Sequence, residues 1–189
     1  MGGSFNPAHD GHRYISHVAL ARLGLDEVWW LVSPQNPLKP EAGMAPFESR
    51  LESAATVARD RRIRVSAIER ELGTRYTADT LKALRNRYPA ARFVWLMGAD
   101  NLVQIPGWRA WTQIFSTIPI AVFARDSYDS RALSEVASVR FRHARIPERA
   151  ARLLPDIAPP AWVFLRMRPH PATATALRRS GAWPAGSEN

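Results

Sequence analysis

The sequence predicts an α/β protein: a doubly wound parallel sheet of Rossmann-like architecture in a single domain. Two observations support this fold class. Five short apolar runs alternate with segments of helical pattern, and the 189 residues contain no Ser/Gly-rich linker or compositional break. Strand, helix, strand alternation is typical of parallel sheets with right-handed crossovers. In such sheets ligands bind outside the carboxyl ends of the strands, so motifs that directly follow strands are candidates for function.

The predicted strands are apolar runs, mostly rich in Val, Ile, Phe and Trp, at residues 27–33, 63–68, 93–97, 118–124 and 162–167. Helices are predicted between them at residues 12–23, 46–59 and 77–88. The first ends at Gly24, the second has a proline in its first turn, and the third stops before Pro89. We expect the domain to span residues 1–182 and a disordered tail to span residues 183–189.

The start of the chain departs from this pattern. A doubly wound domain normally opens with a strand that leads into its first phosphate loop, whereas here the loop begins at Gly2. Loss of a central strand would leave backbone donors and acceptors of its neighbours unpaired. We therefore expect the first strand to be missing upstream of Gly2.

The composition excludes several classes of function. Without cysteine, the chain has no disulfide framework, thiolate metal site or cysteine nucleophile. It lacks a signal-peptide profile and an apolar run of about 20 residues, so we expect a cytoplasmic protein without membrane contacts. The formal charge of +9, from 26 Lys+Arg against 17 Asp+Glu, attracts phosphate groups of any kind. Its scattered arginines lack interleaved aromatic residues, which favours a solvated basic face over nucleic-acid binding.

The densest motif is residues 2–12, GGSFNPAHDGH, a glycine-containing loop that runs into a helix. Glycines let the backbone approach a ligand closely, and the first helical turn offers unpaired amides and a positive dipole end. His9 and His12 are placed at the helix start to point toward the same anion. Two histidines without a third histidine nearby make a poor zinc site, and the G-x-G-x-x-G spacing of dinucleotide-binding loops is absent. We assign surface or core roles to the remaining histidines, His17, His143 and His170.

Polar side chains also accompany two other predicted elements. Residues 33–39 follow an apolar strand and bring Asn36 and Lys39 to its carboxyl end. Without further context this segment is a turn with a solvated lysine. Thr77 opens a predicted helix, where its own role could be that of an N-cap.

Another segment combines an acid with two indoles. Asp100 follows a predicted strand directly and is suited to accept hydrogen bonds from ribose hydroxyls. Trp108 is suited to stack on a pyridine ring. The alternative is that Trp108 and Trp111, three residues apart, form the buried face of a helix, and we favour that role for Trp111.

Together these segments resemble the bacterial nicotinate-nucleotide adenylyltransferases of the H-x-G-H nucleotidyltransferase superfamily. Residues 2–12 match G-G-[ST]-F-[DN]-P-x-H-x-G-H, and residues 98–111 match G-A-D-N-L-x(5)-W-x-x-W. Residues 36–39 match N-x-x-K, and residues 76–81 are similar to Y-T-x-D-T-L. The C-terminal element I-S-S-T-x-[IL]-R is matched more loosely, because its isoleucine and both serines are replaced by Ala172, Thr173 and Ala174. The resemblance covers nearly the whole chain.

The resemblance implies an adenylyltransferase that joins ATP and nicotinate mononucleotide to give deamido-NAD (nicotinate adenine dinucleotide) and pyrophosphate. The implied catalytic residues are His9, His12, Lys39 and Arg178. The implied ATP-binding residues are Gly2, Gly3, Ser4, Phe5, His12, Asp100, Thr175 and Arg178. The implied nicotinate mononucleotide-binding residues are Asn36, Lys39, Thr77, Trp108 and Arg109. Mg²⁺ is expected to arrive with ATP, without a metal site of the protein's own, and homo-oligomerisation is left open.

Two rival interpretations remain at this stage. A related nucleotidyltransferase could use nicotinamide mononucleotide, phosphopantetheine, or a sugar or glycerol phosphate, although Trp108 argues against the non-aromatic acceptors. From a different class, a basic RNA-binding or regulatory protein could have kept a nucleotidyltransferase shell. The net charge, the missing strand and the weakened C-terminal element favour that second alternative, whereas the intact motif residues argue against it.

Overall fold

A computed structural model of the chain describes residues 1–34, 43–124, 129–168, 170–180 and 183. Its internal contacts divide the chain into two compact units. The first unit comprises residues 1–20, 26–75 and 170–189, and the second comprises residues 21–25 and 76–169. Each unit contains its own parallel sheet accompanied by helices, which confirms the predicted α/β class.

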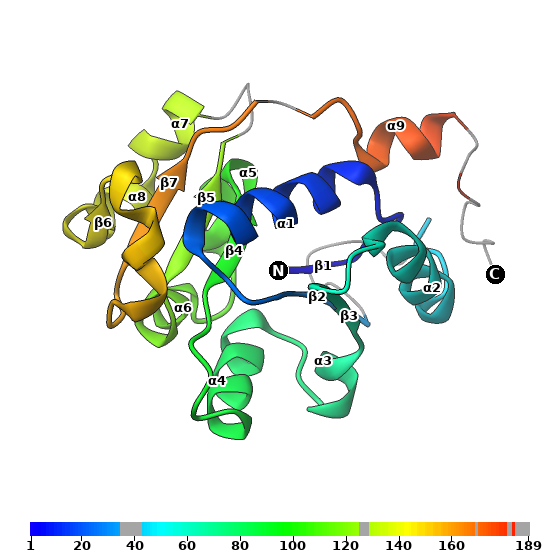
Figure 1. Ribbon diagram of the computed structural model, residues 1–189, viewed down its shortest axis with the longest axis horizontal. Coiled ribbons are helices and arrows are strands. Elements are labelled where there is room, and N and C mark those ends of the chain that lie inside the picture. The colour runs from blue at the N-terminus through cyan, green and yellow to red at the C-terminus, as the bar shows by residue number, and fades with distance from the viewer. Residues whose placement is uncertain (35–42, 125–128, 169, 181–182, 184–189) are drawn as a thin grey trace. The chain divides into compact units, whose positions relative to one another are not determined.

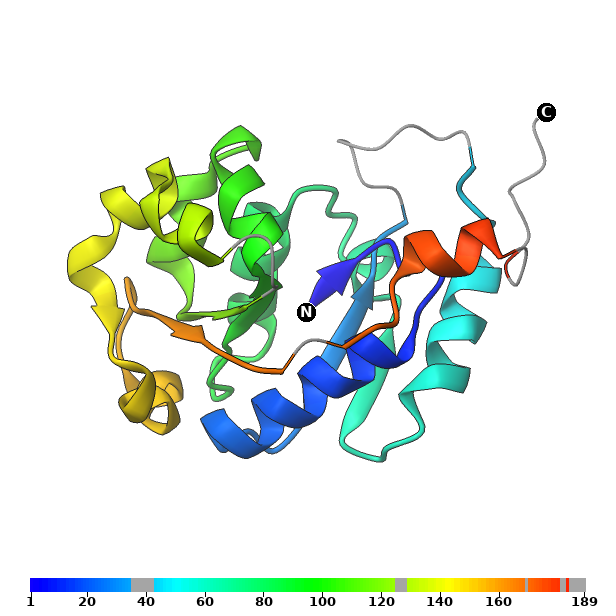
Figure 2. The ribbon, with the colours of Figure 1, turned by 90° about the horizontal axis from the view of Figure 1, so that it is seen from above.

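The first unit is built on a sheet with the strand order β1-β2-β3. Its strands are β1 (Gly2–Gly3), β2 (Val28–Val32) and β3 (Ile63–Ser66). All of them pair in parallel: Gly3 lies opposite Val32, and Trp30 lies opposite Val65. Figure 2 shows the short β1, in dark blue, beside β2.

Most of the described helices of the first unit follow its strands in sequence, and the last one lies near the C-terminus of the chain. They are α1 (Asp10–Leu23), α2 (Phe47–Ala58), α3 (Ile68–Glu71) and α9 (Ala174–Arg179), with the last turn of α1 assigned to the second unit. Since α1 and α2 each connect neighbouring parallel strands, right-handed crossovers place both on the same face of the sheet (Figure 1). Trp30 of β2 is fully buried and belongs to this unit's core.

The second unit is built on a sheet with the strand order β4-β5-β7-β6. Its strands are β4 (Trp95–Gly98), β5 (Ile120–Phe123), β6 (Arg145–Ile146) and β7 (Trp162–Leu165). Every residue of β4, β5 and β7 is buried. Apolar runs that are buried on both faces are typical of parallel strands covered by helices.

Helical segments make up most of the remaining second unit. The α-helices are α4 (Thr77–Arg87), α5 (Ala99–Gln104), α6 (Trp111–Thr117), α7 (Asp129–Ser134) and α8 (Val136–Arg140). The 3₁₀ segments are η1 (Ile105–Gly107), η2 (Arg142–Ala144) and η3 (Glu148–Asp156). None of the described helices is both long enough and apolar enough to cross a membrane.

All five predicted strands are present: β2 and β5 are shorter at both ends, β3 and β7 are shorter at their C-terminal ends, and β4 is shifted toward Gly98. The ends of the three predicted helices differ from the observed ends by at most two residues. The prediction that the phosphate loop begins at Gly2 is wrong, because Gly2 and Gly3 form the strand β1. The other unpredicted strand, β6, is also only two residues long, too short to carry an alternating pattern. Of the predicted tail, Trp183 is described and residues 184–189 lie outside the described residues.

Candidate active site

The loop between β1 and α1, residues 4–9, is shaped around the ring of Phe5. This residue has a φ of 46°, in the left-handed region, and only 3% of it is exposed. Its ring stacks on Trp30 at a centroid distance of 5.2 Å and packs against the His12 ring at 4.9 Å. Because the ring belongs to the core, the groups that Phe5 offers to a ligand are those of its backbone.

The two motif histidines are in direct contact. Their ring centroids lie 3.8 Å apart, and the backbone N–H of His9 donates to Nδ1 of His12 at 3.1 Å. An Nδ1 atom that accepts a hydrogen bond carries no proton, so the proton of the neutral His12 imidazole sits on Nε2. His9 is buried and His12 is half-buried. The loop thereby sets His12 up as a donor through Nε2.

The backbone at His12 is tied to the sheet. Its carbonyl oxygen accepts from the Ser16 hydroxyl at 2.9 Å, and that hydroxyl accepts from the Trp30 indole N–H at 2.8 Å. Ser16 is fully buried. Buried hydrogen bonds of this kind restrict the first turn of α1 to one position relative to β2.

The close surroundings of Gly11 explain why the motif has a glycine between its histidines. A Cβ atom at this position would lie 2.8 Å from Nδ1 of His9 and 2.9 Å from the carbonyl oxygen of Ala172. Both distances are below ordinary van der Waals contact. The glycine therefore leaves room for the His9 ring and for the chain segment that leads into α9.

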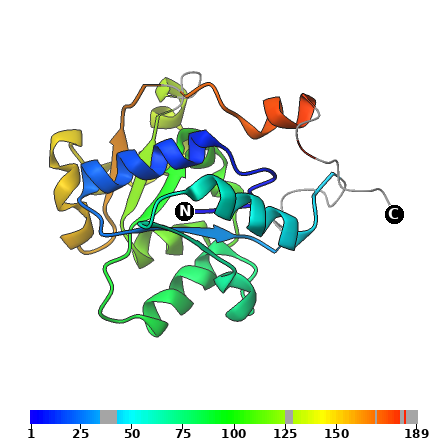
Figure 3. The ribbon, with the colours of Figure 1, turned by 45° about the vertical axis from the view of Figure 1, so that its right-hand side comes forward.

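The C-terminal helix brings the predicted Thr175 and Arg178 to this loop. Thr173 caps α9, since its side chain accepts from the Ala176 N–H at 3.2 Å. Arg178 donates through Nη1 to the carbonyl oxygen of Asn6 at 2.6 Å and through Nη2 to the Thr175 hydroxyl at 3.3 Å. Figures 1 and 3 show α9 next to the N-terminal end of α1. The segment in which sequence similarity is weakest thus contacts the segment in which it is strongest.

Asn6 links three parts of the first unit. Its Oδ1 atom accepts from the Trp183 indole at 2.8 Å and from the Ala45 N–H at 3.2 Å. Its Nδ2 atom donates to the carbonyl oxygen of Gly43 at 2.9 Å. Asn6 therefore fixes the loop after β1 to the residues that precede α2.

Glu69 is a buried acid of the same unit. Only 7% of it is exposed, and its carboxylate accepts a hydrogen bond from the Ser33 side chain. Burial raises the pKa of Glu69 to about 6, whereas the Ser33 hydrogen bond and the positive charge of the Met1 amino group act in the opposite direction.

We predict that Glu69→Gln stabilises the protein at neutral pH. Because the pKa of Glu69 in the folded state lies above 4.5, its favourable contribution is complete below that pH and is lost as the pH rises through about 6. The loss amounts to about 2 kcal/mol of unfolding free energy, which glutamine avoids because it does not ionise. Urea unfolding should show the variant more stable than wild type at about pH 7.5 and equal to it near pH 4. Equal stability at both pH values would contradict the prediction.

In the second unit, Thr77 is the first residue of α4, and Tyr76 holds the N-cap position without a capping side-chain bond. The suggestion that Thr77 itself is the N-cap is therefore wrong. The guanidinium of Arg109 lies 4.6 Å from the centre of the Tyr76 ring and 3.4 Å from Oδ2 of Asp79. The fold thus brings Arg109 to the start of α4, whose first backbone amides have no partner within the helix.

Trp108 and Trp111 do not share a helix. Trp108 follows η1, Ala110 has a φ of 52°, and α6 begins only at Trp111. The Trp111 ring packs edge-on against Phe115 and Phe141 at 6.2 and 5.9 Å, consistent with the packing role expected for it. The alternative that both tryptophans lie on one helix is wrong, because Ala110, between them, has a left-handed backbone and is the N-cap of a new helix.

Asp100 lies where the sequence placed it, in the first turn of α5 directly after β4. Gly98, the last residue of β4, is the N-cap. The acid is half-buried at the carboxyl end of its strand. The predicted Asn36 and Lys39 lie outside the described residues.

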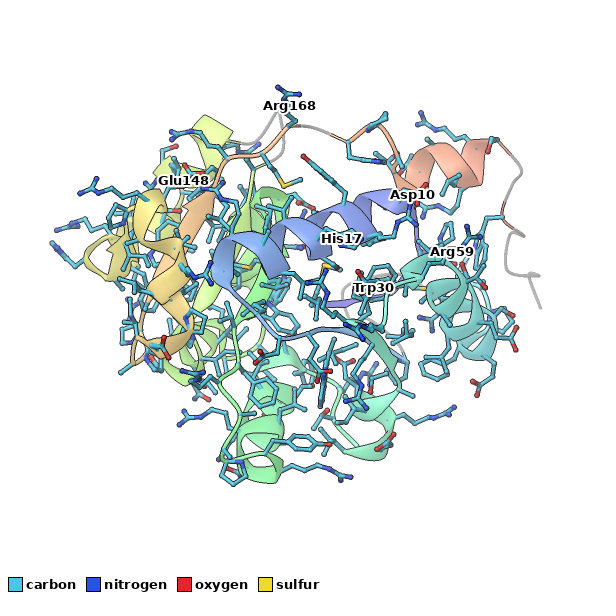
Figure 4. All side chains as sticks on the ribbon, in the orientation of Figure 1. Asp10, His17, Trp30, Arg59, Glu148 and Arg168 are labelled. Carbon is cyan, nitrogen blue, oxygen red and sulfur yellow. The ribbon has the colours of Figure 1, made fainter. Side chains whose placement is uncertain are left out.

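The other histidines have separate surroundings. His17 lies along α1 away from its N-terminal Asp10 (Figure 4), and its Nδ1 atom is 3.5 Å from Oδ2 of Asp60. Nδ1 of His170 accepts from the Ala172 N–H at 3.2 Å, and His143 is exposed in η2. Within the described residues, no three His, Asp or Glu side chains are grouped so as to hold a metal ion.

No role for Arg50 was predicted from the sequence, although its side chain contacts three segments of the chain, one of which is the loop after β1. A signal existed: Arg50 shares the buried face of α2 with Ala54 and Ala58, at a spacing of four residues. A charged residue on an apolar helix face calls for a partner in the interior.

The parallel α/β fold and the histidine pair at the start of α1 agree with the class that the sequence resembles, the H-x-G-H nucleotidyltransferases. The chain belongs to the cytidylyltransferase-like family, whose match covers residues 1–179. It is 52% identical to the probable nicotinate-nucleotide adenylyltransferase of Parvibaculum lavamentivorans, over 97% of this chain and 91% of that protein. It is 54% identical to the protein of the same name from Erythrobacter litoralis, over 97% of this chain and 84% of that protein. Within the family, its place is thus among the nicotinate-nucleotide adenylyltransferases, and it is an enzyme.

Solved structures agree on the fold. The nicotinic acid mononucleotide adenylyltransferase of Plasmodium falciparum, complexed with NaAD, matches with a TM-score of 0.68 at 15% identity, over 94% of this chain and 80% of that chain. A putative nicotinate-nucleotide adenylyltransferase from Vibrio parahaemolyticus matches with a TM-score of 0.52 at 19% identity, over 76% of this chain and 82% of that chain. At such low identities the likeness concerns the fold alone.

Proposed function

We propose that this enzyme transfers the adenylyl group of ATP to nicotinate mononucleotide, giving deamido-NAD and pyrophosphate in NAD biosynthesis. The observation that carries the proposal is the hydrogen bond from the His9 N–H to Nδ1 of His12, whose ring also contacts that of His9. This bond makes Nε2 of His12 a hydrogen-bond donor, next to the loop whose Asn6 carbonyl accepts from Arg178. Relatives that are 52% and 54% identical over nearly the whole chain carry the name of this activity, which supports the same substrates here.

In the proposed reaction, the 5′-phosphate of the mononucleotide attacks the α-phosphorus of ATP, and pyrophosphate leaves in line. The attacking oxygen is already ionised, so the enzyme needs neither a general base nor a covalent intermediate. Catalysis then consists of positioning and of neutralising charge. Histidine donors and cationic side chains on a loop suit that task.

The proposed roles in the first unit follow from its hydrogen bonds. His9 and His12 donate to phosphate oxygens as charge develops, with His12 acting through Nε2. Arg178, held on the Asn6 carbonyl, binds triphosphate oxygens together with the Thr175 hydroxyl. The backbone of residues 2–5 approaches ATP, and Lys39 and Asn36 hold the acceptor phosphate. Mg²⁺ enters with ATP and shields the charge of the leaving pyrophosphate.

The proposed acceptor subsite lies in the second unit. The unpaired amides at the start of α4, near Thr77, receive the nicotinate carboxylate, and Arg109 adds a positive charge beside them. Trp108 stacks on the pyridine ring, whereas Asp100 of the same unit accepts from the ribose hydroxyls of ATP. A carboxylate benefits from this positive end of the helix more than a neutral amide does.

We predict that pyrophosphate release from ATP·Mg²⁺ is faster with nicotinate mononucleotide than with nicotinamide mononucleotide. The helix dipole at the start of α4 favours the charged acceptor over the neutral one, although Asp79 offsets part of the charge of Arg109, and one such interaction is worth about tenfold in kcat/KM. The measurement is a coupled pyrophosphate assay with each acceptor at matched concentrations. Equal rates would remove the proposed acceptor preference, and inactivity with both acceptors would defeat the proposed substrates. The cytoplasmic location remains a prediction from the sequence.

A further inference from the structure

Arg50 lies in the interior of the first unit without a role in the motifs. Only 1% of it is exposed. Among the residues that the structure describes, no carboxylate forms an ion pair with it. A buried guanidinium is costly unless other groups satisfy its donors.

The hydrogen bonds of Arg50 all go to main-chain carbonyl oxygens. Nη1 donates to Ser4 and to Ser33, each at 2.7 Å. Nη2 donates to Pro34 at 2.8 Å, and Nε donates to Ala45 at 3.0 Å. All three nitrogens of the planar group are therefore in use.

These carbonyls belong to three separate parts of the chain. Ser4 begins the loop that leads from β1 to α1, Ser33 and Pro34 follow β2, and Ala45 precedes α2. Residues 35–42, which include Asn36 and Lys39, connect Pro34 to Gly43 in sequence. One side chain thus holds the loop of the histidine motif and the residues on both sides of the segment that carries the predicted lysine.

Stability alone does not account for an arginine here. Hydrogen bonds to carbonyl dipoles, without a carboxylate, offset only part of the desolvation cost of a buried cation, and a well-packed apolar residue of similar volume is often as stable or more so. Burial also lowers the pKa of Arg50, which shows that the environment disfavours the charge. What the guanidinium provides is geometry, because its rigid fork directs donors to three segments at fixed angles.

We propose that Arg50 is a positioning residue that sets the loop after β1 against the chain on either side of residues 35–42. Building on the proposed function, it aligns the groups that hold ATP with those that hold the acceptor phosphate. Within the described residues, every hydrogen bond of Arg50 goes to backbone, and its remaining contact is with the Phe47 ring at 5.4 Å, so Arg50 is not proposed as a catalytic residue. Asn6 supports the same alignment through its bonds to Gly43 and Ala45.

Three variants test this role by steady-state kinetics: Arg50→Met, Arg50→Lys and the control Arg70→Met. Arg50 and Arg70 both lie over the Phe47 ring, at 5.4 and 4.6 Å, but Arg70 is exposed and donates to the Glu48 carboxylate at 2.7 Å. Both Arg50 variants are expected to lose about tenfold in kcat at saturating substrates, because the reacting groups are misaligned. Lysine keeps the charge but not the fork, so a pure charge effect would spare Arg50→Lys. Arg70→Met should keep its kcat within about twofold.

Hydrogen exchange gives a readout that does not depend on activity. In both Arg50 variants, the amides of residues 2–6 and 43–47 should exchange faster than in wild type and in Arg70→Met, while those of β5 and β7 should not change. If Arg50→Met does not fold, Arg50→Lys decides. A folded Arg50→Lys with wild-type kcat and unchanged exchange would overturn the proposal. Inactivity of the wild-type enzyme would instead defeat the proposed function, and the exchange data would then decide the positioning role by themselves.

Discussion

Replacing His12 with alanine is expected to lower kcat by about a hundredfold or more. The variant loses the Nε2–H donor that the loop prepares, since Nδ1 of His12 accepts from the His9 backbone. The bond from Ser16 goes to the backbone carbonyl of residue 12 and remains. The protein should therefore fold, and the loss should appear in turnover. The measurement is pyrophosphate release at saturating ATP·Mg²⁺ and nicotinate mononucleotide, together with thermal unfolding of each variant.

Two further substitutions separate the donor from the packing of the ring. In His12→Asn the amide can still accept from the His9 N–H but does not reach the position of Nε2, so its kcat should be as low as that of His12→Ala. His17→Ala removes another histidine of α1, which lies 3.5 Å from the Asp60 carboxylate and has no proposed role in the reaction. This variant should retain activity. A near-normal kcat in a folded His12→Ala would remove His12 from the proposed chemistry.

The core of each unit could be predicted from the sequence because apolar runs of four or more residues signal buried strands. The run at Val28–Val32 and the run at Trp162–Leu165 became central strands as expected. The two-residue strands β1 and β6 could not be predicted, since their hydrogen bonds depend on a neighbouring strand and on no local pattern. Ala110, in the left-handed region, likewise gives no sequence signal, and it separated Trp108 from Trp111.

For the candidate site, the sequence indicated candidate residues but not the hydrogen bonds that connect them. The contact of Arg178 with the Asn6 carbonyl joins residues 172 positions apart, and spacing along the chain carries no information on such a pair. Arg50 was missed for a related reason: its partners are carbonyl oxygens, which every residue possesses. Long-range bonds to backbone are therefore the part of this site that only a three-dimensional structure supplies.

Gly11→Ala is expected to lower kcat by about a hundredfold, although alanine is the better helix former by about 1 kcal/mol. The new methyl group would lie 2.8 Å from Nδ1 of His9 and 2.9 Å from the carbonyl oxygen of Ala172. The His9 ring could rotate away, but the Ala172 carbonyl is backbone and moves only with the segment that leads into α9. The substitution should thus displace His9 and Arg178 together. The measurement is kcat with both substrates saturating.

The matched control is Gly107→Ala, because a Cβ at Gly107 meets no atom within 4 Å. It adds the same methyl group and should leave kcat close to wild type. Helix propensity and the steric clash act in opposite directions on the unfolding temperature, whereas only the clash acts on turnover. A Gly11→Ala variant that is folded yet has lost its turnover would show that the glycine serves the geometry of the histidine pair. A variant with wild-type kcat would mean that α9 yields without cost, and the proposed role of Arg178 at the Asn6 carbonyl would fail with it.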